Sequence, residues 1–249
     1  MKNSKLPSRR SLTDFQPQLE RIERRLFLKQ GLSLGALSLL SGCTLKDDDS
    51  VDRVLWAMSR WNDRVQAALF NPEKLAPTYS EAEVTTPFPF NAYYEEALAP
   101  VIDGASYRLS LAGLIEDKRP WSLDALHGLP RVTQITRLVC VEGWSAVGRW
   151  SGVPLKNFLE RIGADLNAKY VGFQCADKYW TSIDMPSALH PQTLMVMDFS
   201  GTKFGYPLRI RIPTKLGFKN PKFVTEISVS NDFPGGYWEM KGYNWFSGS

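Results

Sequence analysis

Arg137-Leu-Val-Cys140-Val-Glu-Gly-Trp-Ser145, followed by Arg149-Trp-Ser-Gly-Val-Pro154, is the stretch around which the chain is organised. Apolar residues lead up to a single cysteine and Gly143 then breaks the run, so we predict a buried strand over residues 132–142 that presents one thiol at a turn. A cysteine in such a place is often a small buried hydrophobe. The alternative is a metal ligand, because Arg137 and Arg149 would favour a thiolate and transition metals bind thiolates.

The first 42 residues have the pattern of an export signal. Arg24-Arg25-Leu-Phe-Leu-Lys29 precedes an apolar run over residues 31–40, which is too short to span a bilayer and has the length of a signal-peptide core. A twin-arginine pair in this setting resembles the signal of the Tat route. Because that route carries folded proteins, the leader favours an enzyme that receives a cofactor in the cytoplasm and works in the periplasm or cell envelope.

The net charge of +4 comes from this leader. Residues 1–42 hold eight Lys or Arg and three Asp or Glu, whereas the rest of the chain holds 22 basic and 23 acidic residues. The remainder is therefore nearly neutral and shows no basic patch with interleaved aromatic residues. We expect no nucleic-acid partner.

The leader ends in a second signal. Leu40-Ser41-Gly42-Cys43 resembles the lipobox of bacterial lipoproteins, in which the cysteine is acylated and becomes the new N-terminus. Two acyl chains are enough for stable anchoring to a membrane. The alternative is ordinary cleavage at the small residues, which would leave Cys43 a free thiol. We expect residues 43–50, which are rich in Asp, to be a solvated tether ahead of one domain over residues 51–249.

The periodicity of that domain alternates between strands and short helices, which favours an α+β fold. Residues 51–70 form the clearest helix, with Val54, Met58, Val65 and Leu69 on one face that we expect to dock on the domain. We predict strands over residues 107–114, 169–175 and 222–230 and short helices over 122–126 and 154–162. Asn91 has the character of a helix N-cap, and the aromatic tail over residues 237–245 is typical of a packing clamp.

Three separated motifs together resemble the sulfite oxidase family of molybdopterin-dependent oxidoreductases. They are the cysteine stretch in its V-C-V-E-x-W setting, Asn91-Ala-Tyr-Tyr94-Glu95, and Gly205-Tyr-Pro-Leu-Arg209-Ile-Arg211-Ile-Pro213 with Gly217-Phe-Lys-Asn-Pro-Lys222 behind it. The resemblance covers roughly residues 85–245. It implies a molybdopterin-binding domain with mixed β-sheets and short helices.

The resemblance also implies a set of site residues. Cys140 would ligate molybdenum and be the catalytic residue, and the remaining contacts to the pterin would come from Asn91, Tyr94, Glu95, Cys175, His190, Phe204, Arg209, Asn220, Pro221 and Lys222. Arg209 would bind the pterin phosphate, because a planar guanidinium can donate two hydrogen bonds to one phosphate. The alternative for Arg209 and Arg211 is a solvated basic strand edge. For Cys175, the alternative to a pterin contact is a disulfide with Cys140, because an exported protein reaches an oxidising compartment.

The implied chemistry is two-electron oxygen-atom transfer at molybdenum carried by one pyranopterin, and the members that the chain resembles most reduce sulfoxides such as methionine sulfoxide. Oxidation in the manner of a sulfite dehydrogenase is the alternative reaction, and a non-catalytic binding protein on the same fold is the alternative class. The sequence has no C-x-x-C-H motif and no four-cysteine cluster set. Electrons would therefore pass to or from a separate haem-bearing membrane subunit or cytochrome.

Overall fold

The computed structural model of the chain describes residues 49–197, 199 and 204–248. The predicted signal peptide, Cys43 and the first part of the predicted tether lie outside these ranges. The chain divides into two units, of which the second, Trp56–Ser249, carries both sheets and the site. Among the described helices, none combines the length and the apolar character that a membrane span requires.

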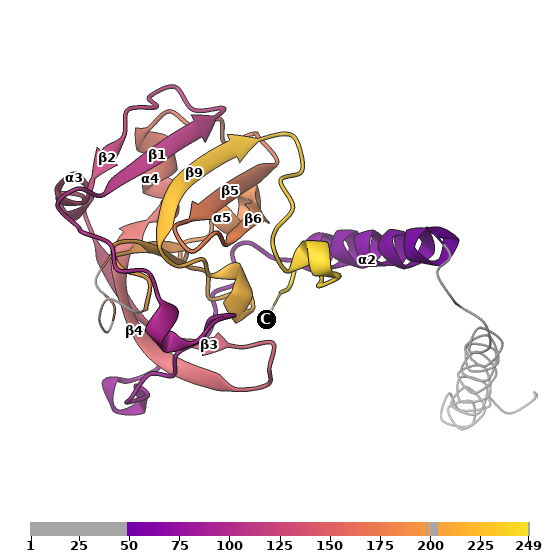
Figure 1. Cartoon of the computed structure of the whole chain (residues 1–249), viewed down its shortest axis with the longest axis horizontal. Helices are drawn as coiled ribbons and strands as arrows, with labels where there is room; N and C mark the ends of the chain where they lie inside the picture. Colours follow the sequence, from indigo (N-terminus) through magenta and orange to yellow (C-terminus); the bar gives the residue numbers. More distant parts are fainter. Residues whose placement is uncertain (1–48, 198, 200–203, 249) are drawn as a thin grey trace, which may run out of the picture. The chain divides into compact units, whose positions relative to one another are not determined.

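A five-stranded sheet has the order β2-β1-β9-β5-β6 (Figure 1). The pairing of β1 with β9 is parallel, and the other pairings in this sheet are antiparallel. Its strands are β1 (Arg108–Gly113), β2 (Trp121–Ser122), β5 (Tyr170–Cys175), β6 (Trp180–Asp184) and β9 (Val224–Ser230). The sheet is therefore mixed, as predicted.

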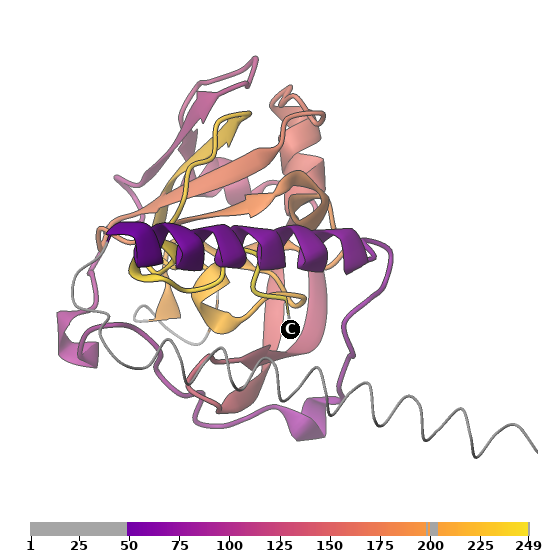
Figure 2. The ribbon, with the colours of Figure 1, turned by 90° about the vertical axis from the view of Figure 1, so that its right-hand side faces the viewer.

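A four-stranded antiparallel sheet has the order β3-β4-β7-β8. Its strands are β3 (Val132–Val139), β4 (Ser145–Pro154), β7 (Leu194–Val196) and β8 (Arg209–Arg211). The long hairpin of β3 and β4 extends beyond the rest of this sheet and carries the cysteine stretch at its turn (Figure 1 and Figure 2). The strand that leads to the cysteine is thus confirmed, but it ends at Val139 and not at residue 142. The prediction that it is buried is wrong, because β3 is an edge strand in which only Thr136 and Leu138 are buried.

The main core lies between the two sheets. It joins Leu109, Val171 and Ile227 of the five-stranded sheet to Ile210 and Met195 of the four-stranded sheet, and all five side chains are fully buried. Burial of this kind stabilises the fold by about 25 cal/mol per Å² of apolar surface removed from water. The short helices contribute further apolar side chains to the same core; they are α3 (Leu123–His127), α4 (Leu155–Arg161) and α5 (Met185–Ala188).

The predicted short helices are confirmed, and for α3 the local reason is visible. The Ser122 side chain accepts a hydrogen bond from the backbone N–H of Ala125, which caps the helix start. The predicted helix after Asn91 is wrong. The chain there continues without a helix to a single 3-10 turn, η3 (Glu96–Leu98); similar turns are η2 (Glu81–Glu83), η5 (Gly217–Lys219) and η6 (Glu239–Lys241).

The helix α2 (Asp49–Leu69) is confirmed in extent, but its expected orientation is wrong. Met58, Trp61 and Leu69 are 63%, 64% and 80% exposed. The opposite face contacts the domain, where the Asp63 carboxylate accepts a hydrogen bond from the backbone N–H of Phe246 at 2.9 Å. The apolar stripe in the sequence therefore does not mark the face that packs on the domain.

Candidate functional site

A pocket of about 280 Å³ opens where five segments of the chain converge. These segments are residues 90–93, the turn between β3 and β4, residues 177–179 between β5 and β6, the turn over residues 217–222, and residues 238–243 near the C-terminus. The polar and charged side chains of its lining include Asn91, Glu142, Asp177 and Lys222, and Cys140 and Trp238 line it as well.

Cys140 occupies the first position after β3, at the pocket. Its backbone N–H donates to the carbonyl of Trp144 at 2.9 Å, and its own carbonyl accepts from the N–H of Gly143 at 3.2 Å. Gly143 has φ of +93°, a conformation that glycine adopts without strain, so the turn depends on it. The thiol Sγ lies 3.7 Å from Glu142 Oε2, and the indole Nε1 of Trp144 donates to that same oxygen at 2.9 Å.

The expected cationic neighbours of this thiol are absent from its surroundings in the described part of the chain. Arg149 forms an ion pair with Glu81 at 3.2 Å, and the guanidinium of Arg137 lies over the ring of Tyr79. Burial, together with the nearby Glu142 carboxylate, raises the pKa of the Cys140 thiol. The prediction that Arg137 and Arg149 stabilise a thiolate is therefore wrong, because alternation along β3 and β4 turns both side chains to the exposed face.

Asn91 and Lys222 meet on the same side of the pocket. The ammonium Nζ of Lys222 donates to Asn91 Oδ1 at 3.2 Å. Burial, with a smaller contribution from the nearby Arg209, lowers the pKa of Lys222 to about 7. The backbone is close-packed here, because a Cβ on Gly217 would lie 3.3 Å from the carbonyl oxygen of Val139 and 3.6 Å from Asn91 Nδ2.

Arg209 and Arg211 lie side by side beneath this region. Both are at most 1% exposed, and their guanidinium carbons lie 4.8 and 4.9 Å from the centre of the Trp150 ring. Burial lowers the pKa of both groups. The alternative of a solvated basic edge is therefore wrong.

The two arginines differ in their hydrogen bonds. Arg211 donates to Asn220 Oδ1 at 2.9 Å and to the carbonyl of Arg137 at 2.7 Å, and it contacts Thr136 Oγ1. Arg209 donates through Nη1 to the carbonyl of Phe204 at 2.8 Å, but its Nε and Nη2 are buried without a partner among the described residues. A buried donor without an acceptor is unfavourable, so this guanidinium is suited to an anion that the described residues do not provide.

Asn220 and Pro221 shape the turn that reaches the pocket. The Asn220 side chain accepts from the N–H of Ile212 at 2.7 Å and donates to the carbonyl of Leu216 at 2.9 Å, so it holds the turn to β8. The carbonyl of Pro221 accepts from the N–H of Ile210. Both residues line the pocket, as do Asn91, Cys140 and Lys222 from the predicted set.

Tyr94, Glu95 and Phe204 lie near the pocket segments but do not line it. The hydroxyl of Tyr94 donates to Asp177 Oδ2 at 2.8 Å, and burial raises the pKa of that hydroxyl. Glu95 is exposed. The ring of Phe204 packs edge-on against Phe88, and its carbonyl receives the Arg209 bond.

His190 and Cys175 are placed elsewhere. The N–H of Gln192 donates to His190 Nδ1 at 3.2 Å, so the proton of the neutral ring lies on Nε2, which contacts the carbonyl of Lys74 at 3.1 Å. Burial lowers the pKa of this ring. Cys175 ends β5 as a buried residue, and neither it nor Cys140 is in a disulfide, so that alternative is not what the structure shows.

Sequence reasoning missed one side of the pocket altogether. Aromatic side chains make up that side, and they come from Phe90, Tyr93, Tyr179, Phe218, Trp238 and Tyr243. The stacking of Tyr93 on Tyr237, with ring centres 4.8 Å apart, joins segments that are far apart in the sequence. Asp177 was missed as well, because its place in the pocket also depends on segments that are far apart in the sequence. Its position in a polar loop just after Cys175 was a signal that could have found it.

The structural requirements of an anionic, metal-bearing cofactor fit these residues. The Lys222 ammonium, a turn of close-packed backbone and a thiol suited to a soft metal line the pocket. The buried Arg209 guanidinium, with its free donors, is close enough to Lys222 to lower the pKa of that ammonium, but it is not itself among the lining residues. No group of three His, Cys, Asp or Glu side chains suited to a metal ion occurs within the described ranges.

Fold and site together define a cofactor-dependent oxidoreductase. The sequence profile described as "Oxidoreductase molybdopterin binding domain" matches residues 96–238, and the chain belongs to this family. Its cofactor is molybdenum bound to molybdopterin, and its fold is the α+β fold of the sulfite oxidase type. A solved structure, the sulfane dehydrogenase SoxCD from Paracoccus pantotrophus, matches with a TM-score of 0.50 and 21% identity over 54% of this chain and 40% of that one, which supports the fold alone.

Relatives with assigned names point to one branch of the family. A protein of Azospira oryzae, named provisionally as the protein-methionine-sulfoxide reductase subunit YedZ1, is 55% identical over 95% of this chain and 92% of its own length. The protein-methionine-sulfoxide reductase catalytic subunits MsrP of Ralstonia nicotianae and Xanthomonas campestris are 28% and 32% identical over 76% and 64% of this chain. The chain spans 67% and 59% of the length of these two proteins.

Proposed function

We propose that the chain is the catalytic subunit of an envelope enzyme that reduces sulfoxides, with methionine sulfoxide as the substrate class. The names of the relatives support this substrate. The observation that carries the proposal is the chemistry of the pocket lining. Glu142 and Asp177 contribute two carboxylates, Lys222 contributes one ammonium, and most of the remaining lining is aromatic or backbone.

This lining favours a neutral sulfoxide over sulfite. Sulfite is an anion, and the carboxylates of Glu142 and Asp177 would repel it. The one ammonium among the described lining residues is already hydrogen-bonded to Asn91. A sulfoxide carries no net charge, and its methyl and methylene groups gain by contact with rings such as Trp238 and Tyr243.

We assign the polar side of the pocket to the cofactor. Cys140 is the protein ligand of molybdenum, Arg209 binds the phosphate of the pterin through its unpaired Nε and Nη2, and the bonded pair of Asn91 and Lys222 contacts the pterin. Asn220 and Pro221 contribute through the backbone turn. Tyr94, Glu95, Phe204 and Cys175 support these groups from outside the lining, and His190 is given no role.

The reaction consumes two electrons and two protons: a sulfoxide becomes a sulfide, and its oxygen leaves as water. The bound cofactor supplies the two-electron oxygen-atom transfer. The chain supplies binding and orientation, because the aromatic side excludes water from the apolar part of the substrate and the turn at Cys140 fixes the metal beside it. Electrons come from a separate subunit, as the term "catalytic subunit" in the names of the relatives suggests.

Two measurements on protein purified from its native host test this proposal. The first is the content of molybdenum and pterin, which we expect to be close to one of each per chain. The second is turnover of methionine sulfoxide with a reduced dye and of sulfite with an oxidised dye. We expect a clear preference for the sulfoxide; faster oxidation of sulfite would overturn the substrate assignment while leaving the cofactor assignment intact.

We also propose that the enzyme is exported by the Tat route and held at a membrane through acylated Cys43. The twin arginines, the short apolar run and the lipobox support this. A lipid anchor would keep the pocket near a membrane-bound electron donor. It would also restrict the enzyme to the periplasm or cell envelope.

A further inference from the structure

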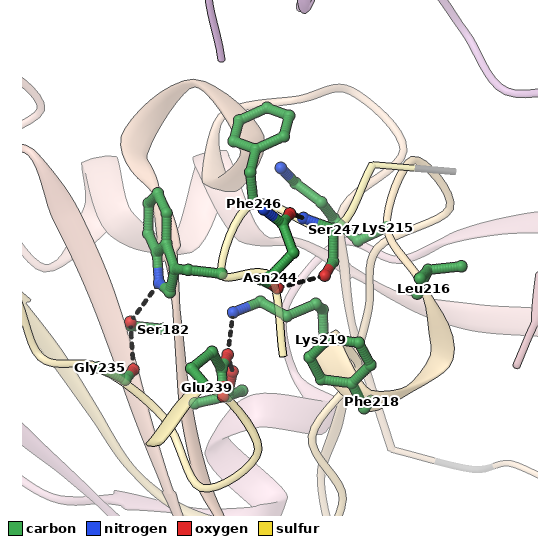
Figure 3. Close-up of polar contacts among 12 residues, drawn as sticks. Ser182, Lys215, Leu216, Phe218, Lys219, Gly235, Glu239, Asn244, Phe246 and Ser247 are labelled. Atoms are coloured by element: carbon green, nitrogen blue, oxygen red, sulfur yellow. Dashed lines mark hydrogen bonds and ion pairs between the residues drawn. The ribbon is translucent and has the colours of Figure 1, made fainter. Parts of the chain in front are cut away.

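One buried ion pair connects the C-terminal segment to the turn beneath the pocket. The Lys219 ammonium, in η5, donates to Glu239 Oε1, in η6 (Figure 3). Both side chains are at most 5% exposed. Thr181 Oγ1 of β6 donates to the same Glu239 oxygen at 2.9 Å, so the pair is tied to a sheet strand as well.

Each partner of this pair lies next to residues that line the pocket, although neither lines it. Lys219 lies between Phe218 and Asn220 of the turn, and Glu239 directly follows Trp238. The backbone N–H of Tyr243 donates to the carbonyl of Trp238 at 3.2 Å, which closes the segment into a loop. The ion pair therefore joins the turn over residues 217–222, which we assign to the cofactor, to the C-terminal segment that carries Trp238 and Tyr243, which we assign to the substrate.

The local backbone is adapted to this pair. A Cβ on Gly236 would lie 2.1 Å from Glu239 Oε2, so only glycine leaves room for the carboxylate in its present position. The hydroxyl of Tyr179 donates to the carbonyl of Phe218 at 2.5 Å, and the N–H of Tyr237 donates to the carbonyl of Trp180 at 2.9 Å. The turn and the C-terminal segment are thus both tied to the start of β6.

We propose that Lys219 and Glu239 are positioning residues, whose ion pair sets the position of Trp238 and Tyr243 relative to the cofactor-binding turn. The assignment of the two sides rests on the proposed function. The bound cofactor orders the turn over residues 217–222. Through the ion pair, this order extends to Trp238 and Tyr243. Substrate affinity would then depend on two charges that touch neither substrate nor cofactor.

A second buried lysine provides a matched comparison. Lys215 forms an ion pair with Asp184 at 3.4 Å and lies against the ring of Phe246, with its Nζ 3.0 Å from the ring centre. It is as buried as Lys219 and also contacts the C-terminal segment (Figure 3). Neither Lys215 nor Asp184 is adjacent in sequence to a residue of the aromatic side. If both ion pairs only stabilise the fold, removing either pair should have the same effect on hydrogen exchange and on KM.

The test compares the double variant Lys219→Met/Glu239→Gln with the control Lys215→Met/Asp184→Asn. Both remove two charges together, so that no unpaired buried charge remains, and Asn keeps the capping of α5 that Asp184 provides. Amide hydrogen exchange is measured over residues 217–222 and 237–243, with protein loaded with cofactor and protein from a host that cannot make it. KM and kcat for methionine sulfoxide are measured on the loaded forms.

In the wild type and the control we expect the cofactor to slow exchange in both segments. In the Lys219/Glu239 variant it should slow exchange over 217–222 only, with KM raised about tenfold and kcat changed by less than about threefold, the pattern of lost substrate binding. Equal protection of residues 237–243 in wild type and variant would overturn the proposal, and so would the same KM change in the control.

If the double variant does not fold, Gly236→Ala displaces the Glu239 carboxylate while both charges remain, and the same loss of protection over residues 237–243 is expected. The exchange measurement does not use catalysis. Coupled protection in a protein that fails to reduce sulfoxides would therefore support the positioning role and reject the substrate, whereas absent coupling in an active enzyme would reject the positioning role alone.

Discussion

The ammonium of Lys222 donates a hydrogen bond to Asn91 Oδ1 at 3.2 Å and so connects two segments that are 131 residues apart in the sequence. Lys222 ends the turn that follows β8, and Asn91 follows the extended segment that precedes the first sheet strand. This hydrogen bond therefore joins residues of two of the three sequence motifs. The third motif contributes Cys140 to the same pocket, which is why the three are more informative together than separately.

The two buried arginines should respond differently to removal. Arg209→Ala should lower the pterin and molybdenum content of the purified protein, because a buried charged hydrogen-bond partner contributes about 1.5–3 kcal/mol, or roughly tenfold in affinity. Arg211→Ala should instead lower the free energy of unfolding of the cofactor-free protein, since it removes the bonds to Asn220 and to the carbonyl of Arg137. Metal analysis and urea unfolding measure the two effects, and equal loss of cofactor in both variants would contradict the assignment of Arg209.

Much of the fold could be predicted because its signals are local. The apolar run that stops at Gly143 indicated a strand with a thiol at its end, and β3 does end at Val139, one residue before Cys140. Ser122 indicated a helix start and caps α3. In both cases the residue that decides the structure acts within a few positions of itself.

The wrong predictions concern regions whose structure depends on contacts between segments far apart in the sequence. Asn91 has the character of an N-cap, but its side chain is bonded to Lys222 and the chain there is not helical. The aromatic side of the pocket depends on contacts of the Tyr93 ring with Tyr237 and Trp238, and no periodicity in the sequence predicts such long-range contacts. Trp61, on the exposed face of α2, shows that an apolar stripe alone does not say what it packs against.

Changing Arg24 and Arg25 together to Lys should leave a cofactor-loaded precursor in the cytoplasm. The predicted signal depends on the guanidinium pair, and a folded chain cannot use a route that requires an unfolded one. Cell fractionation with an antibody against the chain measures the distribution. The pair Arg9-Arg10 is not followed by an apolar run and provides the control: normal export after changing Arg24 and Arg25 would remove the Tat assignment.

Cys43→Ala should release the enzyme from membranes. Without the thiol no acyl chains can be attached, and the anchor contributes about 0.8 kcal/mol for each CH₂ group that it buries. Sedimentation of washed membranes, followed by assay of the supernatant, measures the effect. If the variant remained with the membrane to the same extent as the wild type, the lipoprotein assignment would be wrong.

The stability of a Lys215→Met variant relative to the wild type should decrease as the pH rises. Burial, with a smaller contribution from Lys219, lowers the pKa of Lys215 from 10.5 to about 8, and Asp184 and Asp63 act in the opposite direction. Between these two values the unfolded wild type binds more protons than the folded one, so wild-type stability gains from Lys215 as the pH rises.

Urea unfolding of both proteins between pH 7 and pH 10.5 tests this. The variant lacks the titrating group, so its stability minus that of the wild type should fall by up to a few kcal/mol across the window from about 8 to 10.5. The effects of groups that do not interact with Lys215 cancel in the difference. A difference that stays constant, or rises, would show that folding does not lower the pKa of Lys215.

Cys140→Ser should abolish turnover while leaving the fold and export intact. The substitution barely changes the volume at a half-buried turn, and the turn is held by backbone bonds to Gly143 and Trp144 that a serine retains. Oxygen is a poor substitute for thiolate sulfur as a ligand of molybdenum, so we expect nearly complete loss of sulfoxide reduction. Part of the pterin should remain bound, because Arg209 and Asn91 are unchanged.

Cys175→Ser is the matched control for this substitution. Cys175 is buried at the end of β5 and does not line the pocket, and a serine can keep its backbone bond to the carbonyl of Tyr179. This variant should therefore retain most of its activity. Steady-state rates with methionine sulfoxide and the molybdenum content of both variants decide the matter: wild-type turnover in Cys140→Ser would show that Cys140 is not the metal ligand, and a comparable loss in both variants would show that the effect is one of stability.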